Sequence, residues 1–354
     1  MSKVTIHDVA TLAEVSPATV SRVLNGASVK EDLAKRTYDA IETLGYQVKS
    51  RKKHNAKENV FLIGVIVPDI SSPFYSEIIS GILKESFIYG YEVVIKSSES
   101  LQQREKECLE QLAKLPLNAL IYYPIATIDP LYTMPFYEDI AIVIGGRENM
   151  NTPYAHVYFD NEKAGYLATK YLAKLGKKRI YYLGPIHQLE KPITSFEELL
   201  TLQDGPNKGF YVSLKRFEGY KKALEEENLP LDFNLVSLCG YTWQDGYDAA
   251  RDIVTKMLDV DAIIAVNDVV ATGILKFLKE QGIRVPEDIS VIGYDNRSVA
   301  QISVPLLTTI DQNAYELGRE CVINVMKQVT EKQIENKLLD VELIIRHSTA
   351  ATNI

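Results

Sequence analysis

The sequence predicts a small all-α module at the N-terminus, followed by a larger α/β part made of two parallel-sheet subdomains. Three observations support this fold class. Apolar side chains recur at helical spacing in residues 1–46, short apolar runs alternate with helical patterns from Val60 onward, and positive charge is concentrated in the first 58 residues. A chain of 354 residues has room for two or three domains, because a domain typically holds about 100–200 residues.

The first helix is expected from about Thr5 to Ala13, with the Thr5 hydroxyl as its N-cap. The apolar residues of this segment recur at the i, i+3, i+4, i+7 spacing of one helix face. These residues are Ile6, Val9, Ala10 and Ala13.

A second helix is expected directly afterwards, because Ser16 followed by Pro17 is an N-cap and first-turn pair. Its inward side would carry Val20, Val23 and Leu24. The outward side then presents small side chains, hydroxyls and one guanidinium, from Pro17, Ala18, Thr19, Ser21 and Arg22.

A third amphipathic stretch ends at Gly45, a residue suited to a left-handed C-cap. Its inward residues are Leu33, Thr37, Ala40, Ile41 and Leu44. Three short helices with a tight turn between the first two are typical of a helix-turn-helix, whose second helix enters the DNA major groove. Small residues allow close approach there, and an arginine can reach guanine bidentately. A generic three-helix bundle would give the same apolar pattern.

Charge is segregated along the chain. The whole chain has 39 basic and 47 acidic residues and a net charge of −8. Residues 1–58 hold ten basic and seven acidic residues, a net charge of +3, whereas the remainder holds 29 and 40, a net charge of −11. Five of the basic residues lie between Gln47 and Lys57, without apolar periodicity. Such a segment can lie along a polyanion, although a solvated tether would have the same composition.

The segment VTIHDVATLAEVSPATVSRVLNG, followed by AIETLGY, resembles the DNA-binding headpiece of the lactose/galactose repressor (LacI/GalR) family. The resemblance implies that Pro17, Ala18 and Arg22 contact bases. It also implies that a second set contacts phosphates or positions the helix: Thr5, Ser16, Thr19, Ser21 and Asn25. In the hinge, we expect DNA contacts from Lys49, Arg51 and Asn55.

The hinge departs from the family pattern. Family members commonly carry a leucine there that wedges into the minor groove and kinks the DNA. This chain has Asn55 at that place, within QVKSRKKHNAKEN. We therefore expect binding through this hinge to depend on phosphate contacts, and so to be sensitive to salt.

The remaining residues alternate strand-like and helical segments in two cycles of similar length. Apolar runs joined through helices indicate parallel sheets buried on both faces. The expected strands are FLIGVIVP, EVVIKSS, ALIYYP and AIVIGG in the first cycle, and RIYYLG, VSLCG, AIIAV and ISVIGY in the second. The expected helices are 75–89, 102–115, 162–175, RFEGYKKALEEE, 245–258 and 269–281.

Polar and aromatic residues follow these strands, where ligands of open α/β sheets bind. Carboxylate, amide and guanidinium groups can bind several hydroxyls, and aromatic faces can cover the apolar side of a small ring. A carbohydrate or similar polyol therefore fits best. For Ser71, Trp243 and Asp268 a loop or surface role is the simpler interpretation.

Most of this region also resembles the periplasmic-binding-protein-like effector domain of the same family. The matching segments include GVIVPDISSPFY, RFEGYKKAL and AVNDVVATGILKFLKEQGIRVPEDISVIGYDN. The resemblance implies effector contacts at Asp69, Phe74, Arg147, Arg216, Tyr241, Asn267 and Asp295.

One insertion of about twenty residues, between Pro185 and Arg216, does not match the family pattern. Ser195 and Glu198 in it have the spacing of a capping box, which predicts a short helix. A segment this long is either a flap over the ligand site or an excursion without function.

These observations predict a DNA-binding transcriptional regulator controlled by a sugar or sugar phosphate, a repressor by family analogy. The expected domains are a headpiece at 1–46, a hinge at 47–58 and an effector domain at 59–354. Within the effector domain, subdomain 1 is expected at about 59–160 plus 295–320 and subdomain 2 at about 161–294 plus 321–354.

An enzyme is disfavoured, because the chain has no GxGxxG, GxxxxGK[ST], GxSxG or HExxH motif. No cofactor or metal is expected, and the three cysteines are expected to be buried thiols. A transporter's solute-binding protein would share the cleft, but it would carry a signal peptide and no basic headpiece. We therefore expect a cytoplasmic protein with no membrane contact. Half-sites on duplex DNA call for a homodimer, and no heptad tail that would form a tetramer follows VELIIRHST.

Overall fold

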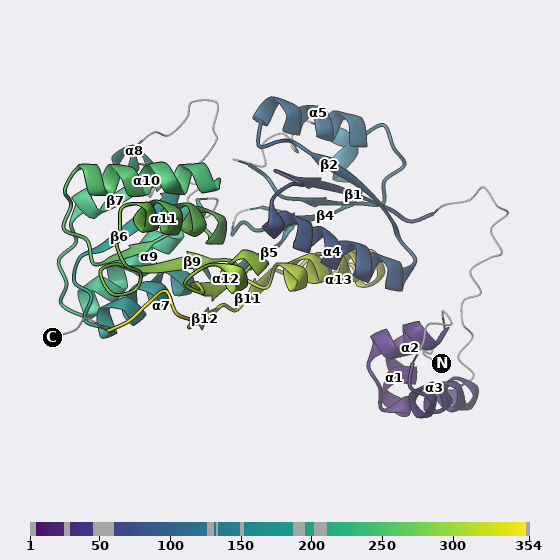
Figure 1. Cartoon of the computed structure of the whole chain (residues 1–354). Helices are drawn as coiled ribbons and strands as arrows, with labels where there is room; N and C mark the ends of the chain where they lie inside the picture. The colour runs from purple at the N-terminus through teal and green to yellow at the C-terminus, as the bar shows by residue number, and fades with distance from the viewer. Residues whose placement is uncertain are drawn as a thin grey trace. The chain divides into compact units, whose positions relative to one another are not determined.

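The computed structural model describes most of the chain (Figure 1). The N-terminal helices fall into one compact unit and nearly all of the α/β part falls into another. Within the described part of the chain, no helix has the length and apolar character to cross a membrane. The described residues are 5–24, 29–44, 60–125, 131, 134–148, 152–186, 195–201 and 211–351.

The N-terminal module consists of α1 (Ile6–Ala13), α2 (Pro17–Leu24) and α3 (Glu31–Leu44). Helix α1 begins at the predicted N-cap, where the Thr5 hydroxyl accepts from the Asp8 amide and the Asp8 carboxylate accepts from the Thr5 amide at 2.7 Å. The apolar periodicity of the sequence is confirmed by a shared core, because Val9, Ala10, Ala13, Val20 and Ala40 are all buried together.

The first sheet of the α/β part has the order β11-β5-β4-β3-β1-β2. The β1·β3, β3·β4, β4·β5 and β5·β11 pairs are parallel, as the apolar runs predicted. The strands are β1 (Leu62–Val67), β2 (Glu92–Ser97), β3 (Ala119–Tyr122), β4 (Ala141–Gly145), β5 (Ala155–Phe159) and β11 (Lys337–Leu339).

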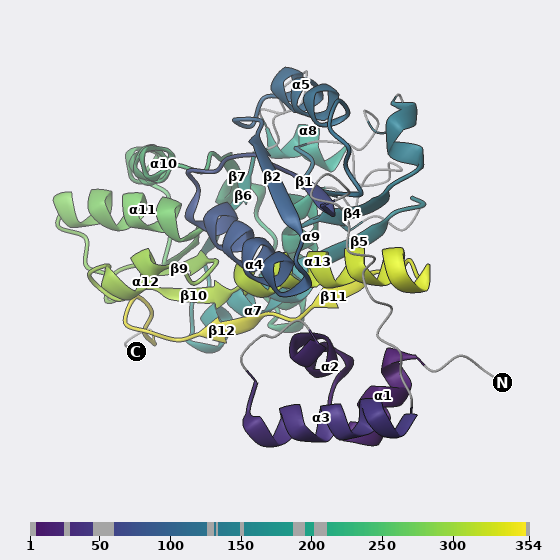
Figure 2. The same cartoon turned by 90° about the vertical axis from the view of Figure 1, so that its right-hand side faces the viewer.

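Helices cover both faces of the first sheet (Figure 1). α5 (Gln102–Leu112) lies on one face, and α4 (Pro73–Tyr89) and α13 (Ala314–Glu331) lie on the other. α4 and α13 run close together in both views (Figures 1 and 2). Glycine at positions 81 and 318 permits this close approach, since a Cβ at either position would overlap the backbone of the opposite helix. A short 3-10 helix, η1 (Pro135–Glu138), precedes β4.

The second sheet has the order β12-β10-β9-β8-β6-β7 and is parallel except for its edge strand β12. Its core holds fully buried residues such as Ile263, Ile274 and Val291. The strands are β6 (Ile180–Pro185), β7 (Val236–Cys239), β8 (Ala262–Ile264), β9 (Ser290–Tyr294), β10 (Thr308–Asp311) and β12 (Glu342–Ile344).

Two helix pairs cover the second sheet. α7 (Asn161–Lys174) packs against α9 (Val212–Glu226), and α10 (Trp243–Thr255) packs against α11 (Asp268–Glu280) on the opposite face (Figure 1). Shorter elements are α8 (Phe196–Leu200), η3 (Phe233–Leu235) and α12 (Ser298–Ile302).

Every strand that the sequence predicted is present, but β5, β10, β11 and β12 were not predicted as strands. β11 and β12 have three residues each and include the charged residues Lys337 and Glu342, and β10 (TTID) is mostly polar. Sheet pairing, rather than an apolar run, therefore defines these three strands. β5 (AHVYF) is largely apolar and buried, and the prediction omitted it.

The predicted division of the C-terminal residues between the subdomains is wrong. Residues 295–320 were expected in subdomain 1, yet β10 pairs with β9 in the second sheet. Residues 321–354 were expected in subdomain 2, yet β11 pairs with β5 and α13 packs on β4 of the first sheet. Only the last part of this range, from β12 onward, lies in the second sheet as expected. The chain passes from one sheet to the other after β5, after β10 and after β11. No change of composition or periodicity in the sequence marks these crossings, so the subdomain boundaries could not be predicted from it.

Part of the insertion forms the predicted helix. The Ser195 hydroxyl accepts from the Glu198 amide at 3.1 Å and caps α8. Phe196 and Leu199 of α8 are buried, and the Phe196 ring lies 4.5 Å from the Phe217 ring. The flanking residues 187–194 and 202–210 are outside the described ranges, so the flap remains a prediction. All three cysteines are free and buried, as predicted.

Candidate functional site

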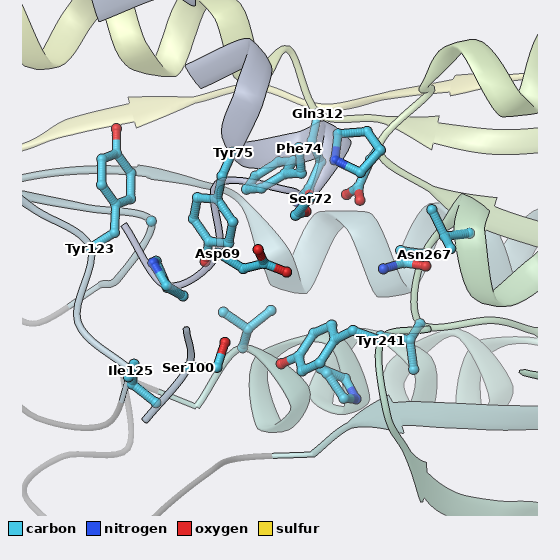
Figure 3. Close-up of a pocket in the computed structure, with 18 of the residues that line it drawn as sticks. Asp69, Ser72, Phe74, Tyr75, Ser100, Tyr123, Ile125, Tyr241, Asn267 and Gln312 are labelled. Carbon is cyan, nitrogen blue, oxygen red and sulfur yellow. The ribbon is translucent and has the colours of Figure 1, made fainter. Parts of the chain in front are cut away.

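A cavity of about 410 Å³ lies at the carboxyl ends of the parallel strands of both sheets. This is the position where open α/β sheets bind ligands, and the volume suits a small molecule. In Figure 3, Asp69 and Tyr241 extend into this space from opposite sides. The seven residues predicted to contact an effector all line it: Asp69, Phe74, Arg147, Arg216, Tyr241, Asn267 and Asp295.

Arg216 is the most thoroughly held polar group of the cavity. Its Nη1 donates to the Val266 carbonyl at 2.9 Å, and its Nη2 donates to Gln312 Oε1 at 3.0 Å. Its Nε donates to Asn161 Oδ1 at 3.2 Å, and its guanidinium lies 4.1 Å from the centre of the Tyr294 ring. A guanidinium has five N–H donors, so two of its donors stay available to a ligand.

Close packing of α7 and α9 places Arg216 in the cavity. A Cβ on Gly165 of α7 would overlap the carbonyl oxygen of Arg216, and a Cβ on Gly219 would overlap that of Glu162. The two backbones therefore approach as closely as they do only because both positions are glycine.

Asp295 differs from Arg216 in that its charge is poorly compensated. The residue is 8% exposed and adopts φ 95°, with its amide donating to the Ile310 carbonyl at 2.8 Å. Among the described residues no donor is bonded to its carboxylate. Burial raises the pKa of this carboxyl to about 6, against the lowering effect of Arg216. Asp295 is therefore a buried acceptor directed at the ligand space.

Asp69 and Asn267 are each fixed by one side-chain oxygen, which accepts a hydrogen bond from a nearby backbone amide. Asp69 Oδ1 accepts from the Ser71 amide at 2.8 Å, and Asn267 Oδ1 caps α11 by accepting from the Val270 amide at 2.8 Å. Among the described residues, Asp69 Oδ2 and the Asn267 amide nitrogen have no hydrogen-bond partner and remain available to the cavity. Asp268, for which the sequence favoured a loop or surface role, is instead fully buried, and its carboxylate accepts from the Thr309 hydroxyl at 2.6 Å. The same interpretation is wrong for Ser71 and Trp243, which both line the cavity.

Arg147 is positioned through its own backbone. The His156 ring contacts the Arg147 carbonyl through Nδ1 at 2.8 Å and the Thr152 hydroxyl through Nε2 at 2.7 Å. Burial lowers the pKa of His156, so the ring is neutral and can donate on one side while it accepts on the other. The Arg147 side chain donates to the Pro124 carbonyl at 3.3 Å.

Aromatic side chains form much of the cavity wall. A planar apolar wall combined with carboxylates, amides and guanidinium groups can hold a ring that carries several hydroxyls. Tyr241 is fixed in this wall by its hydroxyl, which donates to the Ile186 carbonyl at 3.0 Å. The aromatic residues are Phe74, Tyr75, Tyr123, Phe159, Tyr241 and Trp243.

The second candidate site lies on the N-terminal module. Pro17, Ala18 and Arg22 are exposed on α2, while Val20 and Val23 of the same helix are buried. α2 therefore presents outward the residue types that the sequence predicted for a groove-facing helix.

The hydroxyl of Ser16 accepts from the Thr19 amide at 3.1 Å and lies 2.9 Å from the Thr19 hydroxyl. Ser16 thus caps α2 as Thr5 caps α1. Further predicted DNA contacts lie outside the described residues, namely the Ser21 side chain, Asn25, Lys49, Arg51 and Asn55.

Known protein families match both parts of the chain. Residues 5–48 match the family described as bacterial regulatory proteins, lacI family, and residues 169–349 match the periplasmic binding protein-like domain. The HTH-type transcriptional regulator RegA of Clostridium acetobutylicum is 32% identical over 350 residues, which cover 97% of this chain and 98% of that protein. The chain belongs to the lacI family of bacterial regulatory proteins.

Solved structures agree with this lacI-family assignment. A complex of the transcriptional regulator CelR with cellobiose is similar at a TM-score of 0.69 and 26% identity, over 98% of this chain and 99% of that one. The Lac repressor dimer bound to operator and the anti-inducer ONPF is similar at a TM-score of 0.71 and 25% identity, over 99% of this chain and 100% of that one.

Several cavity residues of this lacI-family chain were not predicted. Tyr123, Asn161 and Gln312 line the cavity, and Asn161 and Gln312 both accept from Arg216. Each of them comes one or two residues after a strand. The strand-end rule would have found them had β5 and β10 been recognised as strands and had the residue after β3 been considered.

Proposed function

We propose that this protein is a sequence-specific DNA-binding transcriptional regulator whose operator affinity is controlled by a small sugar-like effector. In this proposal the protein represses genes of carbohydrate utilisation. The observation that carries it is the combination, in one chain, of a lacI-family DNA-binding module and a cavity where seven expected effector residues converge.

The DNA-binding half of the proposal rests on α2. Its exposed Arg22 can bond the O6 and N7 atoms of guanine, and the small Pro17 and Ala18 allow the helix to enter a groove. The capping hydroxyls of Thr5 and Ser16 stand at helix N-termini, where backbone amides favour phosphate. We propose that the basic hinge adds phosphate contacts.

The effector half rests on the chemistry of the cavity. Asp295, Asp69 and Asn267 supply acceptors and a donor for hydroxyls, while Arg216 and Arg147 can bond a hydroxyl or a phosphate. The relative CelR has been solved with cellobiose, which supports a carbohydrate as the ligand class. The relatives named above are regulators, which supports a binding role without catalysis.

We propose that the protein acts as a homodimer. Two recognition helices must reach half-sites about one DNA turn apart, and the similar Lac repressor structure is a dimer on its operator. Ligand binding that moves the subdomains would change the spacing of the two headpieces and thereby their affinity for DNA. The protein would act in the cytoplasm, where the operator is.

A thermal-shift screen against sugars and sugar phosphates tests the effector half. A ligand present at about 100 times its Kd should stabilise the folded protein by about 2.7 kcal/mol. The stabilisation should disappear in Asp295→Ala and persist in Asp139→Asn, which alters an exposed residue. If no compound of either class stabilises the wild type, the carbohydrate assignment is wrong.

A gel shift against the protein's own upstream DNA and a random duplex tests the DNA half. We expect the protein to bind its own upstream DNA more tightly than the random duplex. Equal, weak binding to both duplexes would exclude sequence-specific regulation and favour a solute-binding protein.

A further inference from the structure

Arg297 makes an unusual set of contacts directly behind the cavity. Its residue is 4% exposed, and its Nε and Nη2 both donate to the carbonyl of Asp295, the first at 2.6 Å. Its Nη2 also donates to the Gln312 carbonyl at 3.0 Å, and its amide donates to Asp268 Oδ2 at 2.6 Å. Arg297 therefore binds the backbone of two residues whose side chains line the cavity.

These contacts stabilise a strained segment. Asp295 has a φ value of 95°, which residues other than glycine rarely adopt, and Asn296 has a φ value of 54°, in the left-handed region that asparagine tolerates. The guanidinium of Arg297 folds back onto the Asp295 carbonyl and holds it in this conformation. The direction in which the Asp295 carboxylate points thus depends on Arg297.

The remaining guanidinium nitrogen of Arg297 reaches the other subdomain. Its Nη1 forms an ion pair with Oε2 of Glu77. Glu77 lies on α4, which follows β1 of the first sheet, whereas Arg297 follows β9 of the second sheet. The same helix carries Phe74 and Tyr75 at its start, and both line the cavity. The ion pair therefore joins the two walls of the ligand site.

The two partners differ in their surroundings. The Arg297 side chain is 5% exposed, whereas the Glu77 side chain is 49% exposed. A buried guanidinium needs a counter-charge. Asp311 of the same subdomain supplies part of it, whereas Glu77 adds its ion pair only while the subdomains are close together. Separation of the subdomains would leave the Arg297 charge without this partner.

We propose that Arg297 is a positioning residue for Asp295 and that the Glu77–Arg297 ion pair is a latch that holds the two subdomains closed around the ligand site. The inference rests on the proposed effector site and adds the means by which its closed form is stabilised. A ligand bonded to Asp295 and stacked on Phe74 would contact both subdomains. The latch connects the same two places, because Arg297 holds Asp295 and Glu77 lies on the same helix as Phe74. Loss of the latch should favour the open form.

Trp243 gives a readout of opening that needs no ligand. It is the only tryptophan of the 354 residues, it lines the cavity, and it is 48% exposed. Quenching of its fluorescence by acrylamide measures how open the site is. In Glu77→Gln, the quenching constant of the full-length protein should rise about twofold, and in Glu77→Lys it should rise further.

Salt and a matched control separate a latch from a general surface effect. Salt screens partly exposed ion pairs, so quenching should rise between 0.05 and 0.5 M NaCl in the wild type, while Glu77→Gln should be nearly insensitive to it. Glu110→Gln removes an exposed glutamate from α5 of the same subdomain and should behave like the wild type. Because Glu77 is half-exposed, its variants should fold, which circular dichroism checks.

The latch is wrong if Glu77→Gln and Glu110→Gln give the same quenching constant and the same salt response as the wild type. This result would leave the regulator proposal standing, since sequence-specific DNA binding is measured separately by the gel shift. Conversely, a wild type that shows the latch but no preference for its upstream DNA would overturn the regulator and not the latch.

Discussion

Asp295 and Arg216 show how single residues of the cavity divide stability and binding between them. Arg216 is bonded to Val266, Gln312 and Asn161 and is part of the structure even without a ligand. Asp295 is buried with a carboxylate that no described donor compensates, so its charge opposes folding until a ligand bonds it. Residues of this kind mark functional sites.

Asp295→Asn should therefore stabilise the ligand-free protein at neutral pH. The pKa of Asp295 is raised to about 6 in the folded state, above its unfolded value of about 3.9. The carboxyl therefore destabilises the wild type most strongly above pH 6, and this effect fades as the pH falls from 6 through 4 and vanishes below that, where both states are protonated. The variant should gain up to about 2–3 kcal/mol at pH 7, measured by urea unfolding at several pH values.

The same variant should lose effector binding, because the amide replaces one acceptor oxygen by an NH2 donor and removes the charge that strengthens hydrogen bonds from hydroxyls. Asp139→Asn, at an exposed position, serves as the control and should change neither quantity. A stability gain in Asp295→Asn that is equal at pH 4.5 and pH 7 would show that the carboxyl charge is not its cause.

Arg22→Ala should weaken binding to the specific operator by about 10- to 100-fold, the loss of one bidentate base contact of about 1–3 kcal/mol. Binding to random DNA should change much less. Lys35→Ala removes an exposed cation from α3 and should leave the ratio of specific to random binding unchanged. Fluorescence anisotropy with both duplexes measures this ratio, and an equal loss on the two duplexes would mean that Arg22 contacts phosphate only.

At the scale of single residues, the sequence predicted positions that follow recognised strands. Asp69, Arg147 and Asn267 were found in this way, and all of them line the cavity. Asn161 and Gln312 were missed because the strands before them, β5 and β10, were not recognised as strands. The role of Arg297 was also unpredictable, since it depends on a glutamate 220 positions earlier in the chain.

Helix packing carries the cavity geometry at the scale of elements. Gly165 and Gly219 let α7 and α9 approach closely, and Arg216 lies at this crossing. A methyl group at either position would force the helices apart. The position of Arg216, which we propose contacts the effector, thus depends on two glycines that do not line the cavity.

Gly165→Ala should lower the free energy of unfolding by about 1–3 kcal/mol, the usual range for overpacking, and should weaken ligand binding in the thermal-shift assay. Glu225→Ala, at an exposed position on α9, should stay within about 0.5 kcal/mol of the wild type. Unchanged stability in Gly165→Ala would show that the helices can separate without consequence for Arg216.

Element prediction succeeded where local patterns were strong. Capping at Thr5 and Ser195, and the long apolar strands, could be predicted because side chains within a few residues determine them. The edge strands β11 and β12 could not, because their pairing partners lie far away in the sequence. For the same reason the subdomain boundaries near the C-terminus were placed wrongly.

At the scale of the whole molecule, two sites of different chemistry occur in one chain. The exposed face of α2 suits DNA, and the cavity between the strand ends suits a polar ring. The function we propose requires these sites to be coupled, so that the ligand changes the affinity for DNA and the DNA changes the affinity for ligand by the same factor.

The most direct test is the operator affinity of the full-length protein with and without a saturating ligand identified in the thermal-shift screen, at one salt concentration. The account predicts a change of at least about fivefold, since allosteric couplings are typically about 1–3 kcal/mol, and it predicts that Asp295→Ala abolishes this change. An operator affinity that stays the same with every ligand that stabilises the protein would contradict it.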